Sequence, residues 1–335
     1  MKDERKFKVV LTDYEWPDLE IEHSILSKIG AEFVPAHCVS EDEVIGIARD
    51  ADAVITEYAP LTRRVIEQLE HCKIISMNAA GYDNVDVKAA TKAGILVVNC
   101  PDYCYDEVAD HTMALLLACV RGIVRFDRKI QEKVWGFTSA GRIDRIKGST
   151  LGLLGFGGNA RSIAKRARAF GMRVIAFDPY VSDEIFKRKG VNRVTFEAIF
   201  VESDFISINL PRTPETINLI SQKELSLMKN SAYIVNTSRG SILDEKALFS
   251  ALQQGIIRGA ATDVMEKEPP DFENPLFSCD NLIVTPHAAF YSEDALADVR
   301  TQAAQQVVRV CEGKWPKPIV NNELAANKKT RAILV

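Results

Sequence analysis

The chain has 335 residues, of which 47% are hydrophobic and 26% are charged, and its net charge is −4. At roughly 150 residues per domain, this length predicts two domains of ordinary globular composition. A slightly acidic chain has no excess of Lys and Arg with which to neutralise phosphates, so the composition argues against direct nucleic-acid binding. No apolar run reaches the roughly 20 residues that a membrane-spanning helix needs, so no membrane span is expected.

The cysteines point to a reducing compartment. There are seven of them, an odd number, and only Cys100 and Cys104 lie close together, which is a poor basis for a disulfide framework or a zinc site. The charged start, Met1 to Lys6, has no apolar segment behind it and is unlike a signal peptide. We therefore expect a cytoplasmic protein with free thiols and no metal.

Short apolar runs alternate with helix-period stretches in the first hundred residues. Strands that are rich in β-branched residues and alternate with helices predict a parallel sheet that is covered on both faces. The expected strands are 9–11, 53–55, 74–75 and 95–98, with a helix at about 61–69.

The pattern changes at Pro101, after which a long helix is expected at about 107–124. A second alternating series then begins, and a last helix, about 292–312, precedes a short basic segment, 327–331, that is expected to be a solvated tail. The strands expected in this series are 151–154, 174–177, 205–208, 233–235 and 282–284. The whole pattern predicts an α/β protein with two doubly wound parallel-sheet domains.

A glycine-rich turn follows the strand expected at 151–154. Gly155, Gly157 and Ala160 fit the pattern G-x-G-x-x-G/A, in which the first glycine permits a tight turn and the second lets the backbone approach a diphosphate. The diphosphate would lie at the start of the following helix, where backbone N–H groups lack partners. Asp178 follows about 20 residues after Gly157. Its carboxylate can accept hydrogen bonds from ribose hydroxyls and would repel a 2′-phosphate, so the pattern predicts NAD as the cofactor.

Three charged residues, Arg239, Glu268 and His287, are expected in loops just after strands of the second series, where ligands bind in open α/β sheets. An arginine can bind the carboxylate of a 2-keto acid through two parallel hydrogen bonds. A histidine can give a proton to the keto oxygen, and a glutamate can orient that histidine and favour its protonated form. Each residue alone could belong to a surface ion pair, but together they predict hydride transfer between nicotinamide and a small 2-keto acid. His111, beside Asp110, is interpreted as structural or interfacial.

The segments around these residues resemble the signatures of the D-isomer-specific 2-hydroxyacid dehydrogenase family. The resemblance covers about 8–321 and is closest to the C-terminal-binding-protein-like branch, through His287 to Ser292 and Asp178 to Tyr180. The other matching segments are Asn236 to Gly240, Asp263 to Pro269, Thr285 to Ala289, Gly81 to Asp86, Asn99 to Pro101 and Val108 to Thr112.

The resemblance implies a role for each matching residue. It implies that Arg239 anchors the substrate carboxylate, that His287 is the general acid and base, and that Glu268 is its partner. Backbone N–H groups near Ala80 and Gly81 would also hold the carboxylate, and Phe290 would form an aromatic wall of the substrate pocket. The residues expected to bind the cofactor are Thr112, Gly155, Gly157, Gly158, Asn159, Ala160, Asp178, Leu210, Pro211, Thr237 and Asp263, the last through the nicotinamide amide.

The glycine-rich turn departs from the family at two positions. The family usually has a basic residue and then a branched apolar one, where this chain has Gly158 and Asn159. A side-chain contact to the diphosphate is therefore expected to be lost. The presence of Glu268 rather than glutamine argues against the formate dehydrogenase relatives.

The resemblance also implies the domain organisation. A Rossmann-type cofactor domain, 102–289, would be inserted into a flavodoxin-like substrate domain made of 1–101 and 290–335, with the active site between them. It further implies specificity for the D-isomer and a homodimer formed through the helix 107–124 and neighbouring loops.

The sequence leaves the substrate open. Glyoxylate or hydroxypyruvate, 3-phosphoglycerate, and bulkier apolar keto acids are all compatible with the motifs. Glu57 stands where phosphoglycerate enzymes tend to place a phosphate-binding arginine, which disfavours phosphoglycerate. The resemblance to a corepressor branch also allows a function of a different class, an NAD(H)-sensing interaction protein with little turnover.

Overall fold

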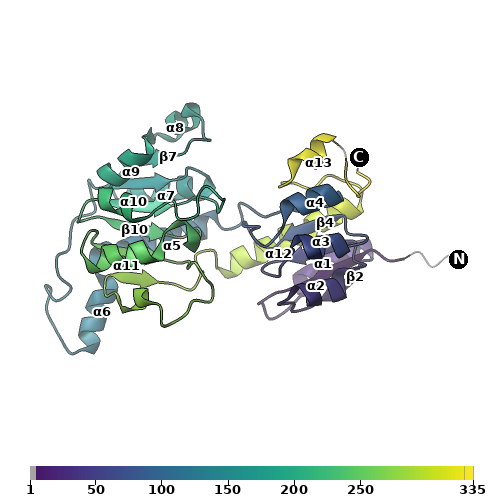
Figure 1. Cartoon of the computed structure of the whole chain (residues 1–335), viewed down its shortest axis with the longest axis horizontal. Coiled ribbons are helices and arrows are strands. Elements are labelled where there is room, and N and C mark those ends of the chain that lie inside the picture. The colour runs from purple at the N-terminus through teal and green to yellow at the C-terminus, as the bar shows by residue number, and fades with distance from the viewer. Residues whose placement is uncertain (1–4, 328, 335) are drawn as a thin grey trace. The chain divides into compact units, whose positions relative to one another are not determined.

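The computed structural model describes residues 5–327 and 329–334, and the chain divides into two compact units (Figure 1). Unit 1 holds the described residues up to Tyr103 and those from Ser292 onward, and unit 2 is Cys104–Tyr291. The boundaries expected from the sequence, 101/102 and 289/290, lie within a few residues of these. Each unit is described by itself below.

Unit 1 contains a parallel five-stranded sheet in the order β2-β1-β3-β4-β5. Successive side chains of a strand point to opposite faces, so Val10, Val54 and Ile75 enter one apolar core and Val9, Ile55 and Ile74 enter the other. The sheet is therefore buried on both faces, as predicted. Its strands are β1 (Lys8–Leu11), β2 (Glu32–Pro35), β3 (Ala53–Thr56), β4 (Ile74–Met77) and β5 (Leu96–Val98).

The helices of unit 1 cover this sheet, and two of them are held by a buried ion pair. The Nε and Nη2 atoms of Arg300 on α12 each donate to a carboxylate oxygen of Glu22 on α1, both at 2.8 Å. Two parallel charge-assisted bonds fix the two helices against each other. The helices are α1 (Glu20–Leu26), η1 (Ser27–Ile29), α2 (Glu41–Ala48), α3 (Arg63–Gln68), α4 (Val87–Ala93), α12 (Glu293–Cys311) and α13 (Asn322–Asn327).

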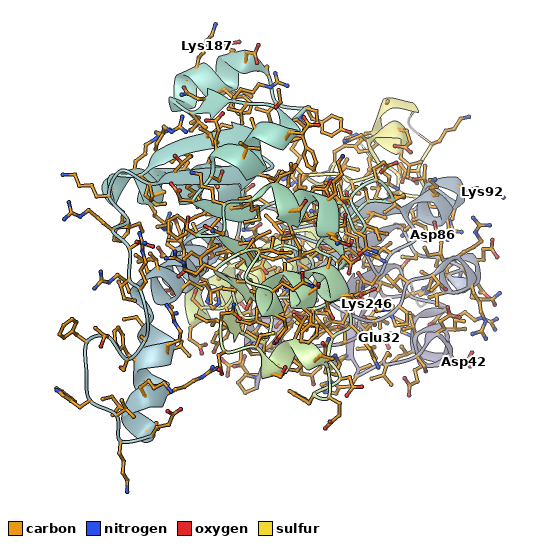
Figure 2. The ribbon with its side chains drawn as sticks, turned by 60° about the vertical axis from the view of Figure 1, so that its left-hand side comes forward. Glu32, Asp42, Asp86, Lys92, Lys187 and Lys246 are labelled. Atoms are coloured by element: carbon orange, nitrogen blue, oxygen red, sulfur yellow. The ribbon has the colours of Figure 1, made fainter. Side chains whose placement is uncertain are left out.

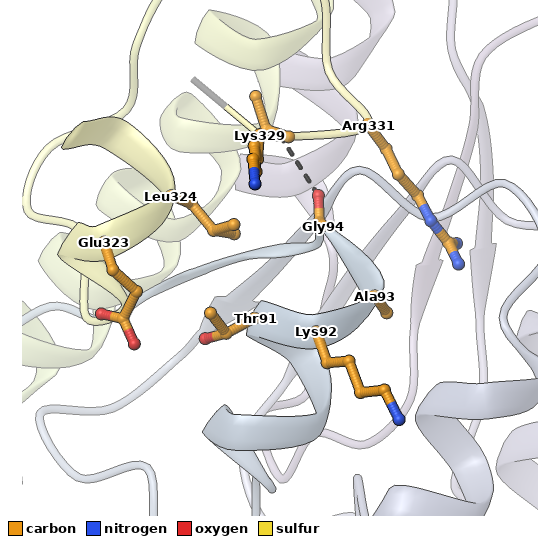
Figure 3. A pocket seen from close by; sticks show the side chains of 9 residues that line it. Thr91, Lys92, Ala93, Gly94, Glu323, Leu324, Lys329 and Arg331 are labelled. Atoms are coloured by element: carbon orange, nitrogen blue, oxygen red, sulfur yellow. Dashed lines mark hydrogen bonds between the residues drawn. The ribbon is translucent and has the colours of Figure 1, made fainter. Parts of the chain in front are cut away.

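The segment expected to be a solvated tail instead packs on unit 1, apart from Lys328, which lies outside the described residues. The backbone N–H of Arg331 donates to the carbonyl of Gly94 at 2.8 Å (Figure 3), and Ala332 is only 6% exposed. A cavity of about 490 Å³ lies beside this contact and is lined by Thr91 and Leu324, among others. The prediction was wrong because Ala332 joins the apolar core behind the charged residues of the segment.

Unit 2 contains a parallel seven-stranded sheet in the order β12-β11-β10-β9-β6-β7-β8. The chain builds outward from β6 in one direction and then returns to build outward from β9 in the other. The strand order therefore reverses between β6 and β9, and ligands bind at the carboxyl ends of the strands at such a point. The strands are β6 (Thr150–Leu154), β7 (Arg173–Phe177), β8 (Asn192–Arg193), β9 (Phe205–Ile208), β10 (Tyr233–Asn236), β11 (Gly259–Thr262) and β12 (Leu282–Val284).

The single helix expected at 107–124 is two helices in the structure. α5 (Tyr105–Arg121) ends at Gly122, whose φ of 63° is left-handed, and α6 (Ile123–Gln131) follows it. α5 buries eight residues, whereas α6 buries none and stands apart from the helices that cover the sheet (Figure 1). The other helices are α7 (Gly158–Ala169), α8 (Asp183–Lys189), α9 (Phe196–Glu202), α10 (Gln222–Leu227), η2 (Gly240–Ile242), α11 (Glu245–Gln253) and η3 (Pro275–Ser278).

Charged side chains such as Asp42, Lys92 and Lys187 lie on the outer faces of their helices and are exposed (Figure 2). Among the described residues, no helix has the length and apolar character needed to cross a membrane. The fold prediction of two doubly wound α/β domains is confirmed.

Candidate active site

The glycine-rich turn lies at the carboxyl end of β6, at the point where the strand order reverses. Gly155 has a φ of +86°, and a Cβ there would lie 2.4 Å from the carbonyl oxygen of Asn209. Both the left-handed backbone and the close approach of the loop after β9 require glycine at this position. The turn thus delivers the chain from β6 into α7, as the G-x-G-x-x-G/A pattern predicts.

The N-terminus of α7 is open. Gly157 is the N-cap, no side chain caps the helix, and a Cβ at Gly157 would have nothing within 4 Å. Gly158, Asn159 and Ala160 form the first turn, so its backbone N–H groups are available to a phosphate. The Oδ1 atom of Asn159 is buried without a hydrogen-bond partner among the described residues. An open cradle next to an unsatisfied acceptor fits a dinucleotide, whose diphosphate and ribose hydroxyls would supply the missing partners.

Asp178 follows β7 directly and is held by the backbone around it. Its Oδ2 accepts from the N–H of Phe156 at 2.8 Å, and its Oδ1 accepts from the N–H of Tyr180 at 2.9 Å. An ionised carboxylate has about four acceptor positions, so two remain for ribose hydroxyls. The carboxylate is thus fixed at the strand end beside the glycine-rich turn.

The remaining expected cofactor residues in unit 2, apart from Thr112 on α5, also lie at the carboxyl ends of its strands. Leu210 and Pro211 follow β9, and the Leu210 side chain lies against Gly155. Thr237 follows β10, and its hydroxyl lies 2.8 Å from the hydroxyl of Thr112 on α5. Thr112 is fully buried and also donates to the carbonyl of Val108 at 2.7 Å, so in this structure it holds Thr237 in place.

Arg239 is positioned by a tightly packed loop after β10. The next residue, Gly240, lies so close to the Met265 backbone that a Cβ there would be 1.9 Å from the Met265 carbonyl carbon. The amide of Asn236 donates to the Arg239 carbonyl at 2.9 Å, and the Arg239 Nη1 donates to the Ser238 carbonyl at 2.7 Å. Only glycine at 240 lets this loop pack against the loop that carries Glu268.

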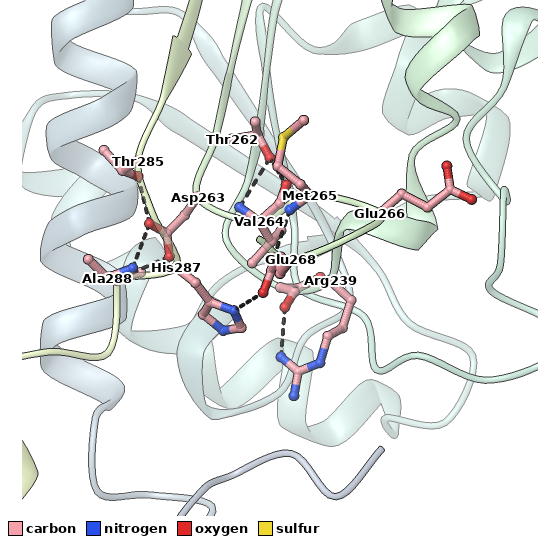
Figure 4. Close-up of polar contacts among 12 residues, drawn as sticks. Arg239, Thr262, Asp263, Val264, Met265, Glu266, Glu268, Thr285, His287 and Ala288 are labelled. Carbon is pink, nitrogen blue, oxygen red and sulfur yellow. Dashed lines mark hydrogen bonds and ion pairs between the residues drawn. The ribbon is translucent and has the colours of Figure 1, made fainter. Parts of the chain in front are cut away.

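Glu268 and His287 form a short ion pair (Figure 4). The Nδ1–H of His287 donates to Glu268 Oε2 at 2.6 Å, and the other carboxylate oxygen accepts from the Met265 N–H at 2.8 Å. Burial acts to raise the pKa of Glu268, but the hydrogen bond and charge of His287, with the Met265 N–H and the charge of Arg239, outweigh it and lower the pKa. Because an ionised carboxylate only accepts, the pair leaves Nε2 of His287 as the atom that can exchange a proton with a ligand.

Asp263, which is 1% exposed, holds the loop that carries His287. Its Oδ1 accepts from the Thr285 hydroxyl at 2.6 Å and from the Ala288 N–H at 2.9 Å, and its Oδ2 accepts from the Ala289 N–H at 2.8 Å (Figure 4). The His287 N–H donates to the Asp263 carbonyl at 2.7 Å. These bonds stabilise a left-handed backbone at His287, whose φ is 53°, and sequence reasoning missed this role.

His111 on α5 joins the same network. Its Nε2 lies 3.0 Å from the Thr285 hydroxyl and 3.5 Å from Asp263 Oδ1. The contact braces the loop that carries His287, in keeping with the structural role expected from the sequence.

The residues expected to bind substrate fall in both units. Ala80 and Gly81 lie in the loop after β4 in unit 1, and within the described residues their backbone N–H groups have no hydrogen-bond partner. Phe290 lies in unit 2, with its ring centroid 6.2 Å from that of His287 in an edge-on arrangement. In the part of the chain that the structure describes, no group of three or more His, Cys, Asp or Glu residues could hold a metal ion.

Comparison with known proteins agrees with this geometry. Residues 113–289 match the NAD binding domain of the D-isomer specific 2-hydroxyacid dehydrogenases. D-3-phosphoglycerate dehydrogenase of Methanocaldococcus jannaschii is 39% identical over 94% of this chain, which spans only 59% of that protein's length. Glyoxylate reductase of Korarchaeum cryptofilum is 36% identical over 85% of this chain and 87% of its own length.

A solved structure shares the whole fold. The crystal structure of a glyoxylate reductase from Paecilomyes thermophila superposes with a TM-score of 0.87 at 28% identity, over 95% of this chain and 99% of that one. The match therefore extends over both sheets, and the glycine-rich turn lies within the residues that match the NAD binding domain. The chain belongs to the D-isomer specific 2-hydroxyacid dehydrogenase family.

Proposed function

We propose that this protein reduces a small 2-keto acid to the D-2-hydroxy acid with NADH, and catalyses the reverse reaction with NAD. The observation that supports the proposal is that Arg239 lies close enough to the Glu268–His287 pair for its charge to lower the pKa of Glu268, in the loops at the carboxyl ends of the unit 2 strands. In this proposal unit 2 is the cofactor domain and unit 1 the substrate domain.

The chemistry follows from the three side chains. The cofactor supplies the hydride. Arg239 binds the substrate carboxylate through its planar guanidinium, and the N–H groups of Ala80 and Gly81 in unit 1 bind the same group. His287 donates the proton on Nε2 to the keto oxygen as negative charge develops there. Glu268 stabilises the imidazolium before that transfer and fixes the ring afterwards, because it accepts from Nδ1 in both states.

The acidic residues of unit 1 favour a substrate without a phosphate. Asp13 and Glu57 follow β1 and β3, which are neighbours in the sheet, and Asp13 accepts from the Glu57 N–H at 3.2 Å. Burial, followed by the charges of Asp13 and Glu15, raises the pKa of Glu57 to about 8. The Asp13 carboxylate at the carboxyl edge of the sheet would repel a phosphate, and Glu57, which is largely protonated at neutral pH, offers no positive charge to bind one. We therefore propose glyoxylate or hydroxypyruvate rather than the phosphorylated acid.

A turnover screen tests this function. NADH oxidation would be followed with glyoxylate, hydroxypyruvate, phosphohydroxypyruvate and longer apolar keto acids at equal concentrations. Rapid turnover of a small unphosphorylated acid supports the proposal, and preference for phosphohydroxypyruvate overturns the substrate assignment. Tight NADH binding with negligible turnover of every acid would indicate instead the NAD(H)-sensing role.

Asp178 is expected to set the choice between NADH and NADPH. An ionised carboxylate facing a 2′-phosphate is a like-charge contact, so the parent should use NADH in preference to NADPH. Replacing Asp178 with alanine should reduce the ratio of the two kcat/KM values. Equal use of both cofactors by the parent would refute this prediction.

Replacing Glu268 with glutamine is expected to change the pH profile of keto-acid reduction. The variant keeps the shape but loses the charge 2.6 Å from His287, so the alkaline limb should move to lower pH. The lowered pKa of Glu268 means that its ionised form stabilises the fold above the ordinary value of 4.5 and loses this effect as pH falls through the lowered pKa. The melting temperatures of parent and variant should therefore converge in acid. A lower melting point at neutral pH with an unmoved alkaline limb would assign Glu268 a purely structural role.

We also propose a homodimer formed through α6 and the loop after it. This segment exposes Ile123, Ile130, Val134, Trp135 and Phe137, and Trp135 and Phe137 are 92% and 90% exposed. The family resemblance makes a second copy of the chain the expected occupant. Contiguous exposed apolar side chains mark interaction surfaces.

Replacing both Trp135 and Phe137 with glutamate is expected to convert the dimer to a monomer, because charges cannot be buried unpaired at an interface. Light scattering after size exclusion measures the mass. Phe272→Glu, at another exposed aromatic residue of unit 2, is the matched control and should remain dimeric. A monomeric parent would refute the proposal.

We propose two further assignments, a branch of the family and a cellular location. The motifs His287 to Ser292 and Asp178 to Tyr180 support a place near the C-terminal-binding-protein-like branch. The free thiols of all seven cysteines support a cytoplasmic location.

A further inference from the structure

The space beside Gly158 is filled by a tyrosine. A Cβ at Gly158 would lie 2.1 Å from Cζ of Tyr105, 2.4 Å from its Cε1 and 2.6 Å from its Cε2. These three atoms form the end of the ring that carries the hydroxyl group. The phenol end of Tyr105 therefore lies where a side chain at position 158 would begin, at the first turn of α7.

The placement of this ring follows from the packing of α5 against α7. Tyr105 is the first residue of α5, and Gly158 is the first residue of α7. Arg166 of α7 donates to Asp110 at 2.6 Å and to Asp106 at 2.9 Å, so the side chain of one helix is tied to two carboxylates of the other. The first turns of α5 are thereby tied to the last turn of α7, and Tyr105, which is partly buried, places its ring against Gly158 at the other end of α7.

The surroundings of the glycine-rich turn differ between Gly157 and Gly158. At Gly157 a Cβ would have nothing within 4 Å, whereas at Gly158 the ring takes the space. A diphosphate that approaches the open backbone at Gly157 would therefore have the Tyr105 hydroxyl close to it, one residue further along α7. A phenol O–H is a good donor to a charged phosphate oxygen and adds no charge of its own.

We propose that Tyr105 is a diphosphate-binding residue of this protein and replaces the side-chain contact that Gly158 cannot make. In this exchange, the side chain that other members of the family have at position 158 is replaced by glycine, and the Tyr105 hydroxyl of α5 takes over as the hydrogen-bond donor. This proposal deepens the proposed function and rests on its cofactor, NADH. It corrects the expectation that the contact is lost, because the donor comes from a residue 53 positions earlier in the chain (158 − 105).

The test is the affinity for NADH and for ADP-ribose, which carries the same diphosphate without nicotinamide. Tyr105→Phe keeps the ring and removes the hydroxyl, so the Kd for both ligands should rise by about tenfold, as for loss of one hydrogen bond to a charged group. NADH fluorescence and competition by ADP-ribose measure the two constants. Tyr233→Phe, at the amino end of β10, is the matched control and should leave both unchanged.

A second pair of variants tests the exchange itself. Gly158→Arg alone should lower the melting temperature, because the new side chain must displace the ring. The same substitution on a Tyr105→Ala background should cost less stability, and it should restore NADH affinity relative to Tyr105→Ala alone. Additive effects on stability and affinity would show that the two residues are independent and would overturn the exchange.

The outcomes separate this proposal from the function on which it rests. If the parent does not bind NADH, the proposed function fails. If the parent binds NADH and Tyr105→Phe binds both ligands as tightly, Tyr105 is not a cofactor residue. If only NADH binding weakens, the hydroxyl acts on the nicotinamide half, and the diphosphate assignment is wrong.

Discussion

His287→Ala is expected to lower kcat for keto-acid reduction by about 10²–10⁴, the range for loss of a general acid, and to leave the Kd for NADH within about twofold of the parent. The reason is geometric: Glu268 accepts from Nδ1, which leaves Nε2 as the proposed proton donor. Stopped-flow measurement of a single turnover, with NADH binding measured separately by fluorescence, distinguishes loss of proton transfer from loss of binding.

His71→Ala is the matched control, because His71 is an exposed histidine of unit 1. It should have the kcat of the parent. If His287→Ala also keeps the parent's kcat and only melts at a lower temperature, the histidine braces its loop and does not transfer the proton.

The strands next to the candidate site were predictable because short apolar runs between helical stretches are typical of buried parallel strands. Leu151 to Leu154 and Val174 to Ala176 are buried in a parallel sheet that is covered on both faces, which demands runs without polar residues. The glycine-rich turn was predictable for a related reason. Gly155 adopts a backbone that other residues avoid, and Asp178 stands at a fixed distance along the chain from it.

The features that the sequence did not predict depend on contacts between distant segments. β11 was not predicted because the side chains of Gly259 to Thr262 are small and form no strongly apolar run. Position 259 must nevertheless be a glycine, because a Cβ there would lie 2.7 Å from the carbonyl oxygen of Asn281. β2 and β8 are edge strands in which every residue is at least partly exposed. In each case tertiary packing outweighs the local pattern.

Two features of the candidate site could not be predicted from the sequence, because contacts between distant segments set them. The left-handed backbone of His287 is set by bonds from Asp263, which lies 24 residues earlier (287 − 263). The ring of Tyr105 over Gly158 is set by the packing of α5 on α7. The motifs identify the candidate residues, and the tertiary contacts set the positions of their atoms.

Arg239→Lys is expected to lower kcat/KM for the keto acid by about 100-fold, mainly through KM, with NADH affinity unchanged. Lysine keeps the positive charge but cannot form two parallel hydrogen bonds to a carboxylate. The loop cannot shift to compensate, because Gly240 packs against the Met265 backbone so closely that a Cβ would lie 1.9 Å from it.

Steady-state kinetics with the best acid of the screen give kcat and KM separately. Arg258→Lys, at the amino end of β11, removes a guanidinium that pairs with Asp144 and should leave kcat/KM unchanged. Parent-like kcat/KM in Arg239→Lys would show that the substrate carboxylate is bound elsewhere, and the loop after β4 that contains Ala80 and Gly81 would then be the place to look.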